Sequence, residues 1–294
     1  MIESFAEMFE ASLTNGQSMQ PGTIVNAIVL ELKPDVVIVD ASWYLPNLNR
    51  NGRAEYEAGH IPGAVFFDID KIADVASGLP HMLPSPQTFA TEMGKLGIGD
   101  GARIVIYDGL GLFSAPRVWW TFRTMGARDV VILEGGAPRW KAENRPWTDE
   151  ATVRRPASFT ARLDHGAVAS LGDMKTYLAT GKAQVVDARP ADRFKGDAPE
   201  PRPGLKAGHM PGAKNVPAGL VSADGALKPA AEIEAIFKNA GVDLEKPIVT
   251  SCGSGVTAAI LALALESTGR SIKALYDGSW AEWGGRDDCD VAKG

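Results

Sequence analysis

The sequence predicts an α/β protein of two tandem domains, each a mainly parallel sheet flanked by helices. Three observations support this fold class. The chain has 294 residues, which is room for two domains of ordinary size. Motifs of the first half return in the second half. Within each half, short apolar runs alternate with segments of helical composition, and this alternation implies βα units and parallel sheets.

The internal repeat consists of four pairs of segments that keep their order and approximate spacing. The pairs are Val36–Asp40 with Gln184–Asp187, Gly59-His60-Ile-Pro-Gly-Ala64 with Gly208-His209-Met-Pro-Gly-Ala213, Arg103–Asp108 with Pro247–Cys252, and Glu134-Gly135-Gly136 with Asp277-Gly278. Self-similarity of this kind is the mark of a repeated structural unit. We therefore interpret the chain as a duplicated domain.

The order of the elements follows from the apolar runs. Candidate strands are 36–40, 103–107 and 129–133 in the first half, and 184–187, 247–251 and 272–276 in the second. The segments 114–125 and 230–240 space their apolar residues as helices do. We expect an N-terminal tail at 1–22, a first domain at 23–146, a polar, proline-containing linker at 147–165 and a second domain at 166–294.

Composition and charge exclude several classes of function. The formal net charge is −6 and no basic patch stands out, so we expect no nucleic-acid partner. The two cysteines, Cys252 and Cys289, form no CxxC or Cys/His pattern, which argues against a disulfide framework and a structural zinc site. The acidic N-terminus resembles neither a secretory signal nor a transit peptide, and no apolar run approaches membrane-spanning length. We expect a cytoplasmic protein that does not enter a membrane.

The strongest candidate for chemistry is Cys252. It ends the strand run Pro247–Ser251 and precedes a Gly-rich turn and an Ala/Leu-rich helical segment. Backbone N–H groups and a helix N-terminus at such a loop favour a thiolate, which makes the cysteine a nucleophile. The alternative is a small, inert cysteine that closes a core strand. The first half has Asp108 at this position, so we expect only the second domain to be catalytic.

The repeat, the paired His-x-Pro-Gly motifs and the loop Cys252-Gly-Ser-Gly-Val-Thr257 together resemble the two-domain rhodanese-type sulfurtransferases. The loop most resembles that of the 3-mercaptopyruvate sulfurtransferases, and the resemblance extends from about Thr23 to about Trp283. It implies that sulfur passes from 3-mercaptopyruvate to Cys252 as a persulfide, with release of pyruvate. The acceptor would be a thiol such as thioredoxin or a small thiol, or cyanide, and no cofactor or metal would be required.

The resemblance also implies roles for residues around the cysteine. Arg193 and Arg202 match the two arginines that bind the substrate carboxylate and keto oxygens, for which the planar guanidinium is well suited. Backbone N–H groups of the loop would hold the persulfide, and the loop residues concerned are Gly253, Ser254, Gly255, Val256 and Thr257. Arg189 is expected in a structural salt bridge near the end of the sheet.

The family's proton relay would join Ser254 to a histidine and an aspartate. We match the histidine to His60. The alternative is that His60 and His209, which share one motif, both hold the turn before Pro-Gly. No aspartate matches, and Asn51 stands in the region where an acid would help. The remaining histidines, His81 and His165, are expected on the surface or in loops. Cys289 is expected to be incidental, because the flanking acids disfavour its thiolate.

Three other functions remain open at this point. A thiosulfate sulfurtransferase would typically carry cationic residues after the cysteine, where this chain has the neutral Gly253 and Ser254. A cysteine phosphatase would need a longer loop that ends in an arginine, whereas this loop reaches Thr257 without one. The third alternative is a non-enzymatic sulfur carrier or binding module.

Overall fold

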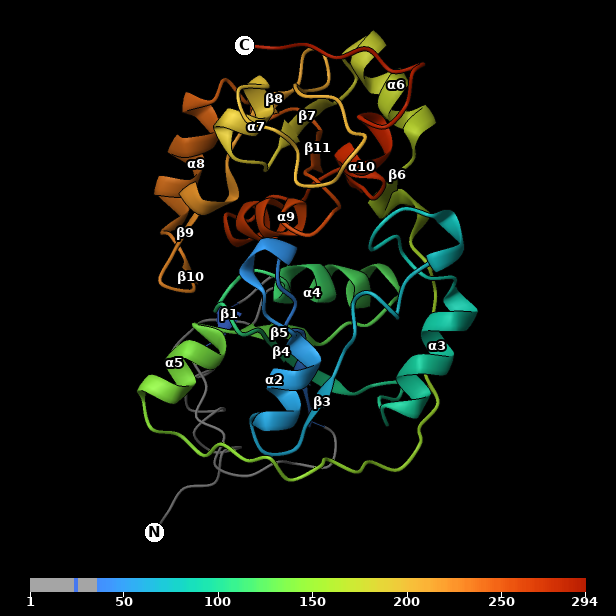
Figure 1. The fold of residues 1–294 in the computed structure, drawn as a ribbon, viewed down its shortest axis with the longest axis vertical. Coiled ribbons are helices and arrows are strands. Elements are labelled where there is room, and N and C mark those ends of the chain that lie inside the picture. Colours follow the sequence, from blue (N-terminus) through green and yellow to red (C-terminus); the bar gives the residue numbers. More distant parts are fainter. Residues whose placement is uncertain (1–23, 26–35) are drawn as a thin grey trace.

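The structure is a computed structural model that describes residues 24–25 and 36–294. The predicted tail at 1–22 and the predicted start of the first domain lie outside these residues. Among the described residues there are two five-stranded sheets with helices around them, one in each half of the chain (Figure 1). The predicted fold class is therefore confirmed.

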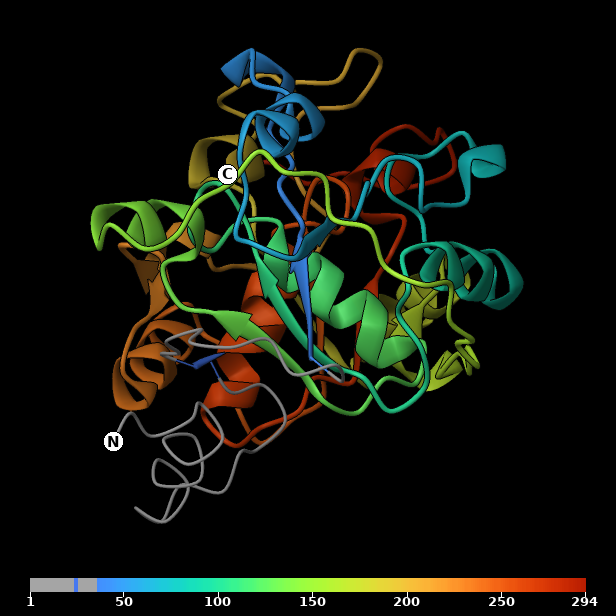
Figure 2. The same ribbon diagram turned by 90° about the horizontal axis from the view of Figure 1, so that it is seen from below.

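The elements of the first half follow the expected alternation. In chain order they are β1 (Ile24–Val25), β2 (Val36–Asp40), η1 (Pro46–Leu48), α2 (Gly52–Ala58), β3 (Ala64–Phe66), η2 (Val75–Ser77), α3 (Pro86–Lys95), β4 (Arg103–Tyr107), α4 (Ala115–Thr124), β5 (Val130–Leu133) and α5 (Gly136–Ala142). The strand order in the sheet is β1-β5-β4-β2-β3, and all its pairs are parallel. Seen from below, these strands lie beside α4 (Figure 2).

The second half repeats this plan. Its elements are η3 (His165–Ala167), β6 (Val168–Ala169), α6 (Leu171–Thr180), β7 (Gln184–Asp187), α7 (Ala191–Lys195), β8 (Lys214–Asn215), η4 (Ala218–Leu220), β9 (Ser222–Ala223), β10 (Ala226–Leu227), α8 (Ala230–Asn239), β11 (Ile248–Ser251), α9 (Ala258–Ser267), β12 (Ala274–Tyr276) and α10 (Ser279–Trp283). The sheet order β6-β12-β11-β7-β8 has the same topology as the first sheet. The short strands, the hairpin β9–β10 and the 3-10 turns were not predicted.

The central strands are built from β-branched residues that are buried on both faces. Every residue of β2, Val-Val-Ile-Val-Asp, is buried, as are all four residues of β11. Such continuous apolar runs are typical of parallel strands covered by helices on both sides. In register, Val249 of β11 lies opposite Val185 of β7, and Ser251 lies opposite Asp187. The carboxyl ends of these strands, where a site is expected in an α/β sheet, therefore meet at Cys252.

Helices α4 and α9 lie at the contact between the two domains. They lie one above the other at the centre of the molecule (Figure 1) and pack directly against each other. Residues Ala258–Leu265 of α9 are all buried, which explains a helix that is apolar around its whole circumference. Nearly all of α4 is buried as well. The hydrophobic core thus continues from one domain into the other.

The segment between the domains packs against the first domain. Ala157 N donates to Gly94 O at 3.1 Å, and Arg162 N donates to Met125 O at 2.9 Å. Phe159 is buried against Phe89 and Phe122. The predicted boundaries of the linker, 147–165, stay a prediction.

Candidate active site

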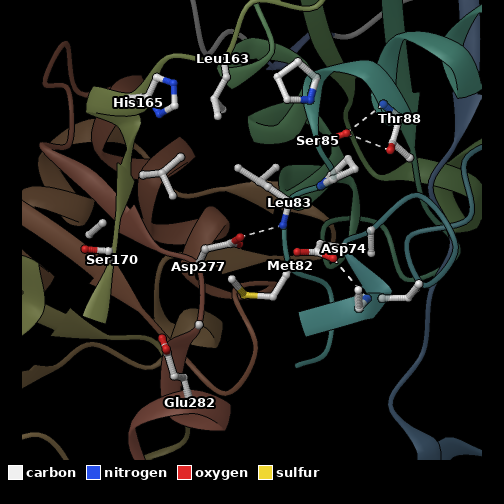
Figure 3. A pocket seen from close by; sticks show the side chains of 18 of the residues that line it. Asp74, Met82, Leu83, Ser85, Thr88, Leu163, His165, Ser170, Asp277 and Glu282 are labelled. Atoms are coloured by element: carbon white, nitrogen blue, oxygen red, sulfur yellow. Dashed lines mark hydrogen bonds between the residues drawn. The ribbon is translucent and has the colours of Figure 1, made fainter. Parts of the chain in front are cut away.

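Cys252 lines a cavity between the two domains. The cavity has a volume of about 440 Å³. One part of its wall is polar and includes Arg193, Arg202 and Ser254. The other part is apolar and comes from both domains, with Trp43, Leu45, Leu112, Phe113, Pro217, Ala218, Val256 and Ile260. A larger cavity of about 930 Å³, shown in Figure 3, also lies between the domains, but Cys252 is not in its lining.

The first domain shows what the cysteine loop can bind. Asp108 occupies the position of Cys252, and its carboxylate accepts hydrogen bonds from four backbone N–H groups. The donors are those of Leu110, at 2.9 Å, and of Phe113, Ser114 and Ala115, at 2.7, 2.9 and 2.8 Å. A strand–loop–helix unit of this kind therefore makes a cradle for an anion. In the second domain the same kind of unit carries a thiol.

The cysteine loop is shaped by two glycines. Gly255 has φ +78°, a left-handed conformation that glycine adopts without cost. A Cβ on Gly255 would lie 2.7 Å from Nη1 of Arg117, and a Cβ on Gly253 would lie 3.3 Å from Nη2 of Arg193. The loop is thus held between an arginine of the first domain and an arginine of the second. Of the loop residues predicted to bind substrate, Gly253, Ser254, Val256 and Thr257 line the cavity.

The two predicted substrate arginines come together at the cavity. Arg193 lies on α7, and Arg202 lies in the loop that follows. Glu200, whose side chain is only 2% exposed, holds Arg193 through Nε and Nη2. Burial, together with the charge of Arg193, lowers the pKa of the Arg202 guanidinium from its ordinary value. Arg202 Nη2 is also 3.4 Å from Ser254 Oγ, which connects the arginines to the cysteine loop.

Arg189 takes the structural role that was predicted. It is buried, and it pairs with Asp187 at 2.7 Å and with Glu200 at 2.7 Å. Its guanidinium also lies over the ring of Trp280. Glu200 therefore links this buried pair to Arg193, and it is a site residue that the sequence reasoning missed.

The structure corrects the assignment of the histidines. His81 lies in a loop, as expected, but it is buried rather than on the surface, and its Nδ1 lies 3.1 Å from Ser254 Oγ. Its Nε2 lies 3.0 Å from Oδ1 of Asp70. This hydrogen bond from His81 is the main cause that lowers the pKa of Asp70. The carboxylate fixes the proton on Nε2, so Nδ1 is left to accept from the Ser254 hydroxyl.

His60 does not reach Ser254. Its Nδ1 donates to Tyr56 O at 2.8 Å, its ring stacks on Tyr56, and its backbone bridges to Thr148. His209 repeats this arrangement in the second domain with Phe194 O and Ala292. The expectation that His60 is catalytic is therefore wrong, because the His-x-Pro-Gly motif uses its histidine to hold a turn in both domains.

The aspartate that lies beside His81 is Asp70, whereas Asn51 caps a helix. The Asn51 side chain accepts from Ala54 N and caps helix α2. Asp70 accepts a hydrogen bond from Trp43 Nε1 at 3.0 Å as well as from His81. Trp43 in turn contacts the edge of the His81 ring, with centroids 4.7 Å apart. No local pattern marks these residues, because their contacts form only when the chain is folded.

A buried ion pair joins the domains behind the cysteine loop. Arg117 of α4 donates to Asp277 Oδ1 at 2.6 Å and to His81 O at 2.5 Å. Oδ2 of Asp277 accepts from Leu83 N at 2.7 Å, the contact between the domains drawn in Figure 3. These contacts fix the His81 segment against the second domain.

The second cysteine behaves as the sequence predicted. Cys289 is buried, and burial, aided by the charge of Asp288, raises the pKa of its thiol. It therefore lacks the environment of a reactive cysteine. His165 begins the 3-10 turn η3 and lines the larger cavity rather than the one that holds Cys252.

The family model described as the rhodanese-like domain matches the chain twice, at residues 27–143 and 170–286. The chain belongs to the rhodanese family. The predicted resemblance to this family is thereby confirmed.

Individual relatives agree with this assignment. The chain is 46% identical to the 3-mercaptopyruvate sulfurtransferase of Homo sapiens, over 84% of each chain. It is 43% identical to the thiosulfate sulfurtransferase of Cricetulus griseus, over 86% of each chain. The crystal structure of the 3-mercaptopyruvate sulfurtransferase SseA from Escherichia coli matches with a TM-score of 0.78 and 43% identity, covering 84% of this chain and 93% of that one. The chain is almost equally identical to a mercaptopyruvate enzyme and to a thiosulfate enzyme, so the sulfur donor has to be argued from the residues of the site.

Among the residues that the structure describes, no helix is long and apolar enough to cross a membrane.

Proposed function

We propose that this protein takes sulfur from 3-mercaptopyruvate onto Cys252 and passes it to a thiol or to cyanide. One observation supports this choice of donor: the cysteine loop is neutral, and the two arginines of the cavity lie outside the loop. Gly253 and Ser254 add no charge at the thiol, whereas Arg193 and Arg202 stand in the cavity wall. This arrangement suits a donor whose carboxylate is separated from its sulfur by the length of the molecule.

The donor half-reaction breaks one bond and forms one. The Cys252 thiolate attacks the donor sulfur, the Sγ–S bond forms, and the C–S bond breaks with its electron pair left on the enolate of pyruvate. Arg193 and Arg202 bind the carboxylate and keto oxygen and stabilise the negative charge that develops there. The product on the enzyme is a Cys252 persulfide, whose outer sulfur the loop N–H groups hold as their counterparts hold the Asp108 carboxylate.

Ser254, His81 and Asp70 handle the proton of this step. His81 Nδ1 accepts from Ser254, so the serine can take the proton of the donor thiol and return it to the enolate carbon. Asp70 keeps the imidazole oriented and stabilises its protonated form. The proton leaves sulfur and arrives on carbon, and pyruvate departs. An acceptor thiolate or cyanide then attacks the outer sulfur and regenerates the Cys252 thiolate.

The test is persulfide formation on an identified cysteine. Purified protein is exposed to 3-mercaptopyruvate without acceptor, and its mass and the released pyruvate are measured. We expect one added sulfur atom and one pyruvate per chain in the wild type and in Cys289→Ser, and neither in Cys252→Ser. Serine is a poor nucleophile toward sulfur, so the variant should keep its fold and lose the reaction. Sulfur carried by Cys252→Ser but not by Cys289→Ser would overturn the proposal.

A further inference from the structure

The turn between β12 and α10 forms hydrogen bonds with the backbone of Cys252, the proposed nucleophile. Ser279 Oγ accepts a hydrogen bond from Cys252 N at 3.3 Å and donates one to Tyr276 O at 2.8 Å. The next two residues donate to the following carbonyls, Trp280 N to Cys252 O and Ala281 N to Gly253 O, both at 2.9 Å. Ser279 and Trp280 thus fix the amide and the carbonyl of Cys252, and with them the direction of its side chain, while Ala281 fixes the carbonyl of Gly253.

Ser279 holds this contact from an unfavourable backbone conformation. Its φ is +52°, in the left-handed region that residues other than glycine, asparagine and aspartate rarely adopt. Ser279 is also completely buried. Conformations of this kind persist where the surrounding structure enforces them, and they cluster at functional sites. The serine at this position therefore calls for a compensating interaction.

The first domain provides the internal comparison. Gly136 stands at the equivalent place, because Ala137 N donates to Asp108 O there just as Trp280 N donates to Cys252 O. The φ of Gly136 is +50°, almost that of Ser279. The first domain thus adopts the same left-handed backbone conformation with glycine, the residue that tolerates it best.

The difference between the two domains extends to the space around the turn. A Cβ on Gly136 would lie 2.5 Å from Asp108 O and 2.9 Å from Gly111 Cα, so no side chain fits there. In the second domain the equivalent place holds the buried side chain of Ser279. What the serine adds over glycine is its hydroxyl, and that hydroxyl binds the amide of the nucleophile.

We propose that Ser279 is a positioning residue for Cys252, which aims the thiol and its persulfide into the cradle of loop N–H groups. This inference rests on the proposed sulfur transfer. Ser279 touches no substrate and acts only through the Cys252 backbone. Its loss should therefore slow the reaction of a bound donor and leave donor binding by Arg193 and Arg202 unchanged.

The experiment separates the hydroxyl from the backbone conformation. Ser279→Gly removes the hydroxyl and relieves the backbone, Ser279→Ala removes the hydroxyl alone, and Asn144→Gly relieves the same conformation (φ +51°) at an exposed residue after α5. We expect both Ser279 variants to lower kcat for 3-mercaptopyruvate about three- to tenfold, the effect of losing one hydrogen bond. KM should stay within about twofold of the wild type. Asn144→Gly should match the wild type, and Ser279→Gly should melt at a higher temperature than Ser279→Ala.

A second measurement keeps the two proposals apart. The rate of Cys252 alkylation by iodoacetamide is followed by mass spectrometry, with Cys289 of the same chain as internal reference. We expect slower alkylation of Cys252 in both Ser279 variants, whatever the sulfur donor proves to be. A wild-type protein that ignores mercaptopyruvate would overturn the proposed function alone. A wild-type kcat and alkylation rate in Ser279→Gly, or a KM that rises as kcat falls, would overturn the role of Ser279.

Discussion

Two histidines in the same chain separate a proton relay from a structural hydrogen bond. We expect His81→Ala to lower kcat about a hundredfold or more, since His81 accepts from Ser254. His60→Ala should leave kcat within about twofold and lower the free energy of unfolding by about 1–3 kcal/mol, because it strips the partner from Tyr56 O. Measurements of turnover and of urea unfolding for both variants show which histidine acts in the reaction and which one only stabilises the fold. The reverse pattern, with turnover lost only in His60→Ala, would reinstate His60 as the relay histidine.

The role of Arg202 is tested through donor kinetics. Arg202→Ala removes a charge-assisted contact with the donor carboxylate, which costs about 1.5–3 kcal/mol, or about one to two decades in kcat/KM for mercaptopyruvate. Arg202→Lys should recover only part of this loss, since an ammonium lacks the planar fork. The control Arg286→Ala alters an exposed arginine that pairs with Asp288, and it should change nothing. Equal donor kinetics in Arg202→Ala and Arg286→Ala would make Arg202 an ordinary surface arginine.

At the scale of elements, we propose that the loop between β11 and α9 decides between donors. Gly253→Arg with Ser254→Lys places two cations beside the thiol, and the donor ratio should shift toward thiosulfate. Mercaptopyruvate turnover should fall for two structural reasons. A Cβ at position 253 already approaches Arg193 Nη2 to 3.3 Å, and the hydroxyl that His81 binds is lost. The measurement is kcat/KM for both donors.

A control pair separates the new charge from the lost hydroxyl. Gly253→Ala with Ser254→Ala should reduce mercaptopyruvate turnover without any gain for thiosulfate. If both double variants show the same ratio of kcat/KM for thiosulfate to kcat/KM for mercaptopyruvate, the charge of the loop does not set donor specificity.

Elements that are defined by local sequence could be predicted, and elements that depend on contacts between distant parts of the chain could not. The strand at Ile248–Ser251, the cysteine after it and the helix Ala258–Ser267 are readable because composition and local spacing define them. The same holds for the repeat that set the fold. The hairpin β9–β10 escaped prediction because its strands are only two residues long and its turn at Asp224-Gly225 docks on Gly135 of the other domain.

The histidine and the aspartate beside Ser254 escaped prediction for the same physical reason on a larger scale. The contact between His81 and Ser254 spans 173 positions of the chain. It forms only where the two folded domains meet, through α4 against α9 and through the contacts of Arg117 and Leu83 with Asp277. No periodicity in the segment around His81 reports such a contact. By contrast, the salt bridge of Arg189 was predictable, since its partner Asp187 is two residues away.

At the scale of the whole molecule, one buried ion pair links domain docking to the site. Arg117→Ala leaves Asp277 buried without its cation, and we expect the free energy of unfolding to fall by about 3–5 kcal/mol. The pair Arg123–Glu266 also joins the domains but is partly exposed, so Arg123→Ala should cost only about 0–1 kcal/mol. Urea unfolding measures both. Adding Asp277→Asn to Arg117→Ala should recover part of the loss, and equal costs at Arg117 and Arg123 would contradict this reading of the interface.

The central claim is that this rhodanese-family site is built for 3-mercaptopyruvate. The most direct test is a comparison of kcat/KM for 3-mercaptopyruvate and for thiosulfate, with the unmodified protein and one shared acceptor. We predict that mercaptopyruvate is preferred by about tenfold or more, the value of one well-placed charge-assisted contact. A protein that uses thiosulfate equally well or better would contradict the account.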